Sequence, residues 1–245
     1  SSLKFVLYGA SPIADDTILK AKEIMKCDLF QVYGLTETAG AITILMPEDH
    51  DPEKGKLRSC GKALNSVEIK VVDDEGNEVK TGDIGEVISK SPLNMKGYWN
   101  RPDATEEAIK DGWFYSGDAG FFDDEGYLYI HDRVKDMIVS GGENIYPAEV
   151  ENALMSHPEI ADAAVIGVPD DKWGESVKGF VVLQPDSSLD ETEIISYSRT
   201  QIAGYKCPKT INFIEALPRN PSGKILRREL REPFWEGKDR MVSGN

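Results

Sequence analysis

Residues 132–151 have the composition of a junction between two folded units, and this stretch constrains the fold of the chain most strongly. It begins with clustered charges, continues through an apolar run at 137–139, breaks at Ser140-Gly141-Gly142 and reaches a helix start at Pro147. Proline suits the first turn of a helix because its missing N–H would be unpaired there, and the acidic residues after it suit the positive end of the helix dipole. An ordinary strand, loop and helix connection would show the same pattern, so the rest of the sequence decides between the two interpretations.

The size and charge of the chain limit its class. With 245 residues, of which 40% are hydrophobic and 29% charged, it is long enough for two ordinary globular domains. Its 28 Lys and Arg against 43 Asp and Glu give a formal net charge of −15, which argues against nucleic acid or an anionic membrane surface as partner. A phosphate-bearing ligand would therefore meet local basic side chains or backbone N–H groups.

Membrane and metal signals are scarce in the sequence. No apolar run approaches the roughly 18 residues that span a bilayer, and residues 1–6 lack the apolar region of a signal peptide. The scattered Cys27, Cys60 and Cys207 suit a reducing compartment, and the three histidines are too far apart in sequence to predict a zinc site. We expect a cytoplasmic protein without an integral membrane segment.

The first part of the chain has the pattern of a strand, a helix and a second strand. Apolar runs at 3–8 and 28–33 are typical of buried strands, and residues 13–26 predict a helix between them. A chain that begins on a core strand is expected to be the C-terminal part of a longer protein. The second strand leads into the loop 34–38, and loops at the carboxyl ends of strands are where open α/β sheets bind ligands.

The rest of the chain predicts two further sets of elements. After a polar loop at 48–56, a small β unit is expected with strands at 67–72 and 85–89, a short helix at 100–108 and a hairpin over 120–130. Beyond the junction, the helices are predicted at 148–156, 191–203 and 225–232. The strands are predicted at 162–168, 177–184 and 210–216. This second set makes an α+β unit of about 110 residues, which is large enough to fold alone.

Two loops of the first half carry groups that suit a nucleotide. Thr36 and Glu37 place a hydroxyl beside a carboxylate at a strand end, which suits a phosphate oxygen and its Mg²⁺; alternatively, Thr36 and Thr38 only cap a helix start. Asp118 lies in a glycine-containing turn. Its carboxylate can accept both hydroxyls of a ribose, or it can simply close the turn.

A basic loop near the C-terminus favours a functional role. Residues 218–228 concentrate positive charge in an acidic chain and hold Lys224 on a loop shaped by proline and glycine. A solvated basic helix would not need such a loop. The basic residues of this stretch are Arg219, Lys224, Arg227 and Arg228.

Gly141 and Gly142 let the backbone come close to a ligand because neither has a Cβ, or they form a flexible turn.

The sequence lacks the glycine motifs of two common enzyme classes, the phosphate-binding loop of P-loop nucleotide hydrolases and the nucleophile elbow of serine hydrolases. Lys224 lacks the earlier glycine of a Gly-x-x-x-x-Gly-Lys-Ser/Thr loop and is followed by Ile225. The chain also lacks a Gly-x-Ser-x-Gly nucleophile elbow.

Together these residues form four motifs in order along the chain. They are Tyr-Gly-Leu-Thr-Glu-Thr at 33–38, Tyr-Ser-Gly-Asp at 115–118, Asp-Arg-x-Lys-Asp-x-Ile-x-x-Gly-Gly-Glu-Asn at 132–144 and Pro-Arg-Asn-Pro-x-Gly-Lys at 218–224. With them the chain resembles, from Gly9 to Arg231, the C-terminal portion of an acyl-CoA synthetase of the adenylate-forming superfamily, which also holds luciferases and peptide-synthetase adenylation domains. Such enzymes join a carboxylate to the α-phosphate of ATP, release pyrophosphate and pass the acyl group to the thiol of coenzyme A.

The resemblance implies an α/β plus α+β fold. Residues 1–57 would be the end of the α/β subdomain of a large N-terminal domain, and residues 58–132 its β-barrel-like subdomain. Residues 133–136 would form a hinge, and residues 137–245 a mobile C-terminal α+β domain. Lys135 occupies the hinge position, where many members of the superfamily carry Asp. The family also suggests a homodimer.

The resemblance also implies roles for individual residues. The residues that lie along the adenine would be Gly9, Ala10 and Tyr33, and Ile130 would pack near it. The ribose hydroxyls would be held by Asp118 and Arg133. Thr36 would contact a phosphate and Glu37 the Mg²⁺. Lys224 would reach the carboxylate and the α-phosphate during adenylation. In thioester formation the 140–143 loop would replace it, with Gly141 and Gly142 flanking the pantetheine tunnel and Trp173 near coenzyme A.

Two departures from the family limit the expected activity. The phosphate-binding loop that is rich in Ser, Thr and Gly and ends in Pro-Lys-Gly is missing from this sequence, as is most of the acyl pocket. We therefore expect the 245 residues alone to be inactive. Overall likeness, especially at 95–100 and 141–147, favours a fatty acid as substrate. The alternatives are an aryl-CoA ligase of the coumarate or benzoate type, an adenylation domain that feeds a carrier protein, and a non-catalytic module that binds nucleotide or acyl-CoA.

Overall fold

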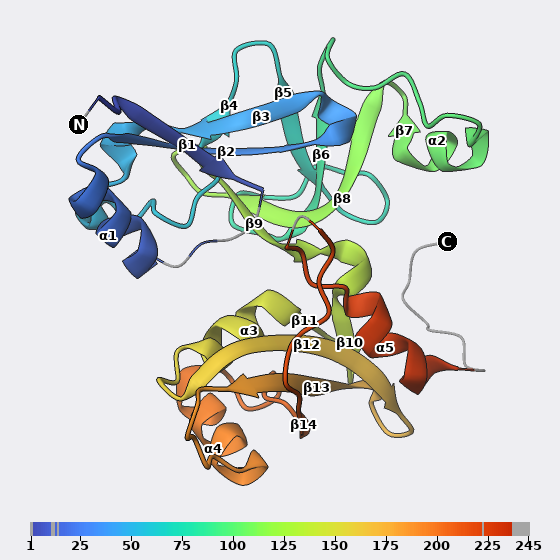
Figure 1. Cartoon of the computed structure of the whole chain (residues 1–245). Coiled ribbons are helices and arrows are strands. Elements are labelled where there is room, and N and C mark those ends of the chain that lie inside the picture. The colour runs from blue at the N-terminus through green and yellow to red at the C-terminus, as the bar shows by residue number, and fades with distance from the viewer. Residues whose placement is uncertain (1, 11–12, 14, 222, 237–245) are drawn as a thin grey trace. The chain divides into compact units, whose positions relative to one another are not determined.

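The computed structural model describes residues 2–10, 13, 15–221 and 223–236 and forms two compact units, Ser1–His131 and Asp132–Asn245 (Figure 1). Each unit has its own sheets and apolar core. The boundary between them falls at the first residue of the 132–151 stretch. Within the described residues, no helix combines the length and the apolar composition needed to cross a membrane.

The first sheet follows the predicted strand, helix and strand and adds two strands. Its strands are β1 (Phe5–Gly9), β2 (Asp28–Leu35), β3 (Gly40–Leu45) and β4 (Lys62–Ala63), in that order across the sheet. α1 (Asp15–Met25) connects β1 to β2, which pair in parallel, and the other pairings are antiparallel. β3 was not predicted, because its apolar run follows the 34–38 loop without a separate turn signal.

The second sheet packs on the first through a shared core. Its strands are β5 (Glu68–Val72), β6 (Gly85–Lys90), β7 (Ile109–Lys110), β8 (Trp113–Phe122) and β9 (Leu128–Arg133). The order is β5-β6-β8-β7, β9 also pairs with β8, and α2 (Pro102–Ala108) precedes β7. Tyr33 of β2 packs against the buried Val87 and Leu128 of this sheet. This packing brings the end of β2 to β8.

In the part of the chain that the structure describes, four short 3-10 helices, η1 to η4, lie in the loops. They are η1 (Thr36–Thr38), η2 (Pro47–Asp49), η3 (Pro52–Lys54) and η4 (Val134–Asp136). The second and third give the predicted polar loop its structure. The first carries the Thr-Glu-Thr part of the first motif, and the last carries Lys135.

The second unit is a five-stranded sheet with helices on both faces. Its strands are β10 (Ile138–Ser140), β11 (Glu143–Ile145), β12 (Ile160–Asp170), β13 (Gly174–Leu183) and β14 (Thr210–Phe213). The order is β11-β10-β13-β12, with β14 parallel to β13. The helices are α3 (Pro147–Met155), α4 (Glu191–Gln201) and α5 (Arg227–Trp235). These elements can be followed in Figure 1.

Alternate residues of β12 serve two separate cores. Ala163 and Val165 join one buried cluster with residues of α3 and α4, whereas Ala164 and Ile166 join another with residues of α5. Side chains on a strand point alternately to its two faces, so a strand covered on both sides must be apolar throughout. The continuous run Ala-Ala-Val-Ile therefore matches the position of β12 inside the unit.

The predicted fold class, α/β followed by α+β, is confirmed. The 132–151 stretch differs in one respect from a simple strand, loop and helix, because Gly141 and Gly142 turn β10 into β11 before α3 begins at Pro147. α5 begins at Arg227 rather than at 225, because Ile225 is still part of a bridge to Arg219.

Candidate functional site

The side chains of Tyr33 and Asp118 meet in the first unit. The Tyr33 hydroxyl at the end of β2 donates a 2.6 Å hydrogen bond to Asp118 Oδ2 on β8. Asp118 is 6% exposed and lies inside β8, so the predicted glycine-containing turn at this position is wrong. The Gly117 N–H before it donates to Glu86 Oε1 at 2.8 Å. Burial and the charge of Asp118 raise the pKa of Tyr33 above its usual range, so the phenol stays protonated as a donor. The structure thus brings together two residues that were predicted to contact a nucleotide.

Gly9, Ala10 and Ile130 lie close to this pair. Gly9 pairs with Val32, the neighbour of Tyr33, and a Cβ on Gly9 would lie 2.2 Å from the Val32 carbonyl oxygen. Ala10 has a φ of 70°, a left-handed conformation that costs free energy in a residue with a Cβ and is concentrated at functional sites. Ile130 packs against the same buried cluster as Tyr33. The four predicted adenine residues therefore gather where parallel β1 and β2 end, the edge at which open sheets bind ligands.

The two threonines of the 36–38 segment have different roles. The Thr38 hydroxyl accepts a hydrogen bond from the Leu35 N–H at 2.9 Å and lies 2.7 Å from the Gly40 carbonyl oxygen, to which it donates. Thr38 is buried, whereas Thr36 is exposed and its hydroxyl has no hydrogen bond to a described residue. The predicted capping role therefore belongs to Thr38, and Thr36 remains available to a ligand.

Glu37 is the candidate for a cation site. Its carboxylate is half-buried and accepts a 2.8 Å hydrogen bond on Oε1 from Tyr98. No group of three or more His, Cys, Asp or Glu residues that could hold a metal ion occurs in the described part of the chain. Mg²⁺ is commonly held by one or two carboxylates together with phosphate oxygens and water. Glu37 therefore fits a Mg²⁺ that arrives with a phosphate group, not a cation held by protein ligands alone.

In the second unit, Gly141 and Trp173 are packed together. Both Gly141 and Gly142 have positive φ values, 62° and 87°, at the turn between β10 and β11. The Gly141 N–H donates to the Trp173 carbonyl oxygen at 2.8 Å, and a Cβ on Gly141 would lie 2.7 Å from Trp173 Cε3. The indole, 44% exposed, thus covers a backbone segment that only glycine can form. This packing fixes the turn. It also brings Trp173, predicted to lie near coenzyme A, to Gly141 and Gly142, predicted to flank the pantetheine tunnel.

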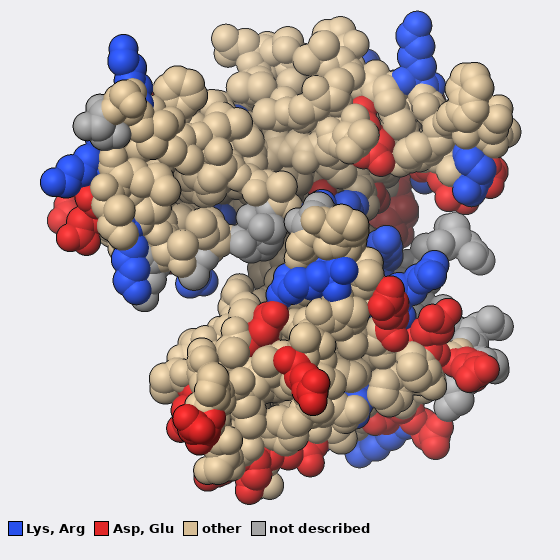
Figure 2. Space-filling view, viewed as in Figure 1, with Lys and Arg blue, Asp and Glu red and all other residues tan. Residues whose placement is uncertain are grey.

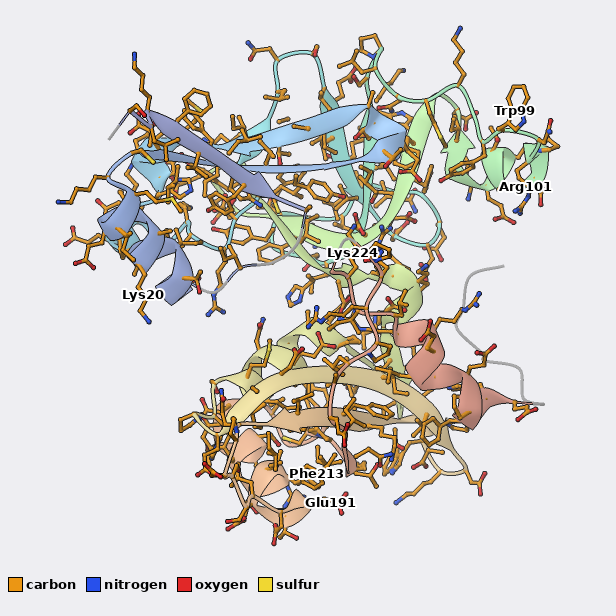
Figure 3. The ribbon with its side chains drawn as sticks, viewed as in Figure 1. Lys20, Trp99, Arg101, Glu191, Phe213 and Lys224 are labelled. Carbon is orange, nitrogen blue, oxygen red and sulfur yellow. The ribbon has the colours of Figure 1, made fainter. Side chains whose placement is uncertain are left out.

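Lys224 lies on a closed loop at the start of the C-terminal segment. Arg219 and Ile225 form a bridge across the loop, and the Lys224 N–H donates to Asn220 Oδ1 at 2.9 Å. The Arg219 guanidinium donates to the Gly223 carbonyl oxygen at 2.7 Å and to Asp162 Oδ2 at 2.6 Å. The Lys224 side chain itself is exposed. Figure 3 labels Lys224 on this loop. A fixed backbone thus presents a lysine to solvent.

In the sequence, Lys135 lies between Asp132 and Asp136, whose carboxylates accept hydrogen bonds from α3 and α5. Asp132 Oδ2 accepts from the N–H of Ala148 in the first turn of α3 at 2.7 Å. Asp136 Oδ1 accepts from Arg231 of α5 at 2.8 Å. Arg133 belongs to the second unit and Asp118 to the first, so the two residues predicted to hold the ribose lie in different units. The hinge role of Lys135 and the ribose role of Arg133 stay predictions.

Three residues that support the candidate site were missed or left without a role by sequence reasoning. Tyr98 bonds to Glu37 over a separation of 61 positions, and Arg219 bonds to Asp162 over 57. Separations of this size leave no periodic signal.

The visible face of the second unit has an uneven distribution of positive charge. Figure 2 shows that the Lys and Arg side chains on this face gather mainly along one edge, whereas Asp and Glu are spread over its surface.

Two family descriptions match the chain. Residues 1–99 match the AMP-binding enzyme family, and residues 149–224 match the AMP-binding enzyme C-terminal domain. The two matches fall on the two structural units. They include the Tyr33, Thr36 and Glu37 segment in the first unit, and Trp173 and Lys224 in the second.

Individual relatives agree with these matches. The fatty acid–[acyl-carrier-protein] ligase ScoC of Streptomyces coeruleorubidus is 43% identical over 243 residues, 99% of this chain and 47% of that protein. The long-chain-fatty-acid–CoA ligase FadD13 of Mycobacterium tuberculosis is 43% identical over 231 residues, 94% of this chain and 45% of that protein. The chain thus spans about half the length of the curated relatives it matches.

A solved structure reproduces the fold. The o-succinylbenzoate CoA synthetase MenE of Bacillus subtilis, in complex with its acyl-adenylate intermediate, has a TM-score of 0.85 and 41% identity. The match covers 94% of this chain and 46% of that one. With the ordered motifs, the two-unit fold and these relatives together, the chain belongs to the AMP-binding enzymes of the adenylate-forming superfamily.

Proposed function

We propose that this chain is part of an ATP-dependent acid–thiol ligase. The protein would join a carboxylic acid to the α-phosphate of ATP with release of pyrophosphate, and would then transfer the acyl group to a thiol. The substrates would be ATP with Mg²⁺, a carboxylic acid and coenzyme A. The 245 residues alone would not adenylate, because they lack the family's phosphate-binding loop.

The observation that carries the proposal is the Lys224 loop. An exposed lysine stands on a loop that a bridge, an asparagine and an arginine hold in one conformation. A fixed positive charge favours the negative charge that develops on the α-phosphate and the attacking carboxylate in the transition state. Removal of such a group typically costs about 10²- to 10³-fold in rate.

The nucleotide would lie along the carboxyl ends of β1 and β2. Gly9 and Ala10 leave room for the adenine, and Tyr33 and Ile130 offer it an aromatic and an aliphatic surface. Asp118, oriented by the Tyr33 hydroxyl, would accept hydrogen bonds from the ribose hydroxyls, and Arg133 would donate to their oxygens. Thr36 would contact a phosphate, and Glu37 would hold the Mg²⁺ that neutralises charge on the phosphates.

We propose a fatty acid as the carboxylic acid. ScoC and FadD13 are named as fatty-acid ligases and support this class. MenE, named for o-succinylbenzoate and comparable in identity, supports an aryl acid instead. The acid is therefore the part of the proposal that an acid panel has to test.

The thiol acceptor would approach the Gly141 turn. A pantetheine arm needs a narrow passage, and glycines without a Cβ allow one, while the exposed Trp173 indole offers a surface for a purine. Coenzyme A is the proposed acceptor. A carrier protein presents the same pantetheine thiol, and the name of ScoC favours it as the second candidate.

The change from adenylation to thioester formation would require movement of the second unit. We propose residues 133–136 as the hinge with Lys135 at its centre, residues 137–245 as the moving domain, and residues 1–57 and 58–132 as parts of the large domain. A hinge motion of this kind brings Lys224 to the site in one state and the Gly141 turn in the other.

The test is carboxylate-dependent ATP–pyrophosphate exchange by the full-length protein, with short, medium and long fatty acids and with aryl acids. Exchange with fatty acids and thioester formation with coenzyme A would support the proposal. Exchange with aryl acids only, or transfer to a holo-carrier protein only, would replace the substrate or the acceptor. A folded protein that binds ATP and exchanges with no acid would indicate a non-catalytic binding module.

A further inference from the structure

Tyr98 makes a side-chain contact with Glu37 that the proposed mechanism does not use. Tyr98 lies on the loop between β6 and α2, and its hydroxyl donates a 2.8 Å hydrogen bond to Glu37 Oε1. Sixty-one positions separate the two residues in sequence. The contact therefore joins the loop that follows β6 to the Thr36–Thr38 segment at the end of β2.

A second hydrogen bond joins the same loop to the same residue. The Met95 N–H donates to the Glu37 carbonyl oxygen at 2.7 Å. Both the backbone and the carboxylate of Glu37 are thus attached to residues 95–98. The loop holds the position of Glu37 through its main chain and the direction of its carboxylate through the tyrosine.

Tyr98 is itself held by α2. Its N–H donates to Thr105 Oγ1 at 2.9 Å, and that hydroxyl donates to the Arg101 carbonyl oxygen at 2.8 Å. Gly97 has a φ of 154°, and a Cβ there would lie 2.8 Å from Thr105 Cγ2, so the loop passes too close to α2 for another residue. The next residue, Trp99, is 90% exposed and points outward (Figure 3).

The arrangement leaves one carboxylate oxygen for a ligand. Tyr98 bonds to Oε1, and no described residue donates a hydrogen bond to Glu37 Oε2. A carboxylate that is held through one oxygen presents the other in a defined direction, and neighbours of this kind typically change metal affinity by about 10- to 100-fold when mutated. From this geometry we propose that Tyr98 is a positioning residue that directs Glu37 toward the Mg²⁺ of bound ATP. The proposal rests on the proposed function, because it takes the cation to arrive with ATP.

A purely structural role for the contact makes a different prediction. If Tyr98 only fastened the loop, loss of its hydroxyl would lower thermal stability and leave the dependence on Mg²⁺ unchanged. If it positions Glu37, the dependence on Mg²⁺ changes, and the change requires the Glu37 carboxylate. Tyr98→Phe removes the hydroxyl alone, and Trp99→Phe is the matched control because it alters the neighbouring exposed ring.

The experiment uses the full-length protein and two measurements. The first is the Mg²⁺ concentration that gives half-maximal ATP–pyrophosphate exchange. The second is direct binding of Mn²⁺ to the protein–ATP complex, measured by electron paramagnetic resonance without turnover. We expect Tyr98→Phe to weaken both by about tenfold, with exchange recovering at saturating Mg²⁺, and Trp99→Phe to match the wild type. In a Glu37→Gln background, Tyr98→Phe should add no further change.

The possible failures are distinguishable. Tyr98→Phe with wild-type Mg²⁺ dependence and Mn²⁺ binding would overturn the positioning role while leaving the proposed function intact. An equal weakening in the Glu37→Gln background would also overturn it, because the effect would not pass through Glu37. Absence of exchange from the wild-type protein would overturn the proposed function, and the Mn²⁺ measurement would then decide the role of Tyr98 separately.

Discussion

Arg219 Nη2 lies 2.6 Å from Asp162 Oδ2, and the same guanidinium donates to the Gly223 carbonyl oxygen, one residue before Lys224. The guanidinium therefore ties the loop to β12. Because a planar guanidinium can make both bonds at once, lysine cannot replace arginine here without loss of one of them. The backbone beside Lys224 is thus held by the side chain of Arg219.

Arg219→Lys should slow adenylation while barely changing stability. We expect the exchange rate to fall about tenfold, because a small misplacement of a catalytic group is costly. The free energy of unfolding should change by less than about 1 kcal/mol, since the ion pair is partly exposed. Exchange assays and urea unfolding check this, with the exposed Arg228→Lys as control. A loss of stability without loss of rate would contradict the positioning role.

Tyr33→Phe should weaken nucleotide binding. The substitution keeps the ring in its buried cluster and removes only the hydrogen bond to Asp118. The bond contributes about 1.5–3 kcal/mol to the folded unit and holds the Asp118 carboxylate in one direction. Without it the carboxylate is misplaced for the ribose, so we expect AMP affinity measured by calorimetry to fall about tenfold. Tyr129→Phe is the control, because its hydroxyl lies 3.4 Å from Asp123, a weaker contact. Unchanged affinity in Tyr33→Phe would show that Asp118 is not oriented by Tyr33.

Gly141→Ala should separate the two half-reactions. Its Cβ would meet Trp173 Cε3 at 2.7 Å, and its φ of 62° is strained for alanine. We expect thioester formation to fall at least about tenfold, as a misplaced site does, with pyrophosphate exchange close to the wild-type rate. Trp173→Ala in the same background should relieve the clash but not the backbone strain. Equal loss of both half-reactions would place Gly141 in the adenylation site or in the fold itself.

His50 should make the first unit sensitive to acid. The ring is fully buried, with Nε2 2.9 Å from the Tyr8 hydroxyl and Nδ1 2.8 Å from the Met46 carbonyl oxygen. Burial, as the largest cause, lowers the pKa of His50 below its ordinary value. The unfolded chain then binds a proton that the folded unit does not, so stability is present above pH about 6.5 and falls as the pH drops below it.

The test for His50 is urea unfolding between pH 5 and pH 8. The wild type should lose stability toward pH 5, and His50→Gln should lose less over the same interval. Equal pH dependence in both proteins would assign the effect to other groups.

The predictability of the structure differed between elements and contacts. Pro147 and the acidic residues after it predicted the start of α3 correctly, because a helix start has local chemistry. The apolar run of β12 predicted a strand, and the structure lengthens it to Ile160–Asp170 through its long pairing with β13. β3 escaped prediction, since its identity as a strand depends on partners elsewhere in the chain.

The same contrast holds for the candidate site. The loop at the end of β2 could be predicted as a ligand loop because such loops follow the carboxyl ends of parallel strands, and this role stays a prediction. The sequence left open whether Thr36 meets a phosphate or whether Thr36 and Thr38 only cap a helix start, and the hydrogen bonds of Thr38 assign the capping role to that residue. The Tyr33–Asp118 and Tyr98–Glu37 bonds span 85 and 61 positions, so they follow from the packing of two sheets and not from local pattern.

The central claim, that Lys224 serves adenylation on a loop separate from the thiol site, is tested most directly by measuring both half-reactions in Lys224→Ala. The full-length variant should lose carboxylate-dependent pyrophosphate exchange by about 10²- to 10³-fold. It should still convert a synthetic acyl-adenylate and coenzyme A to thioester at close to the wild-type rate. Retention of exchange, or equal loss of both half-reactions, would contradict the claim.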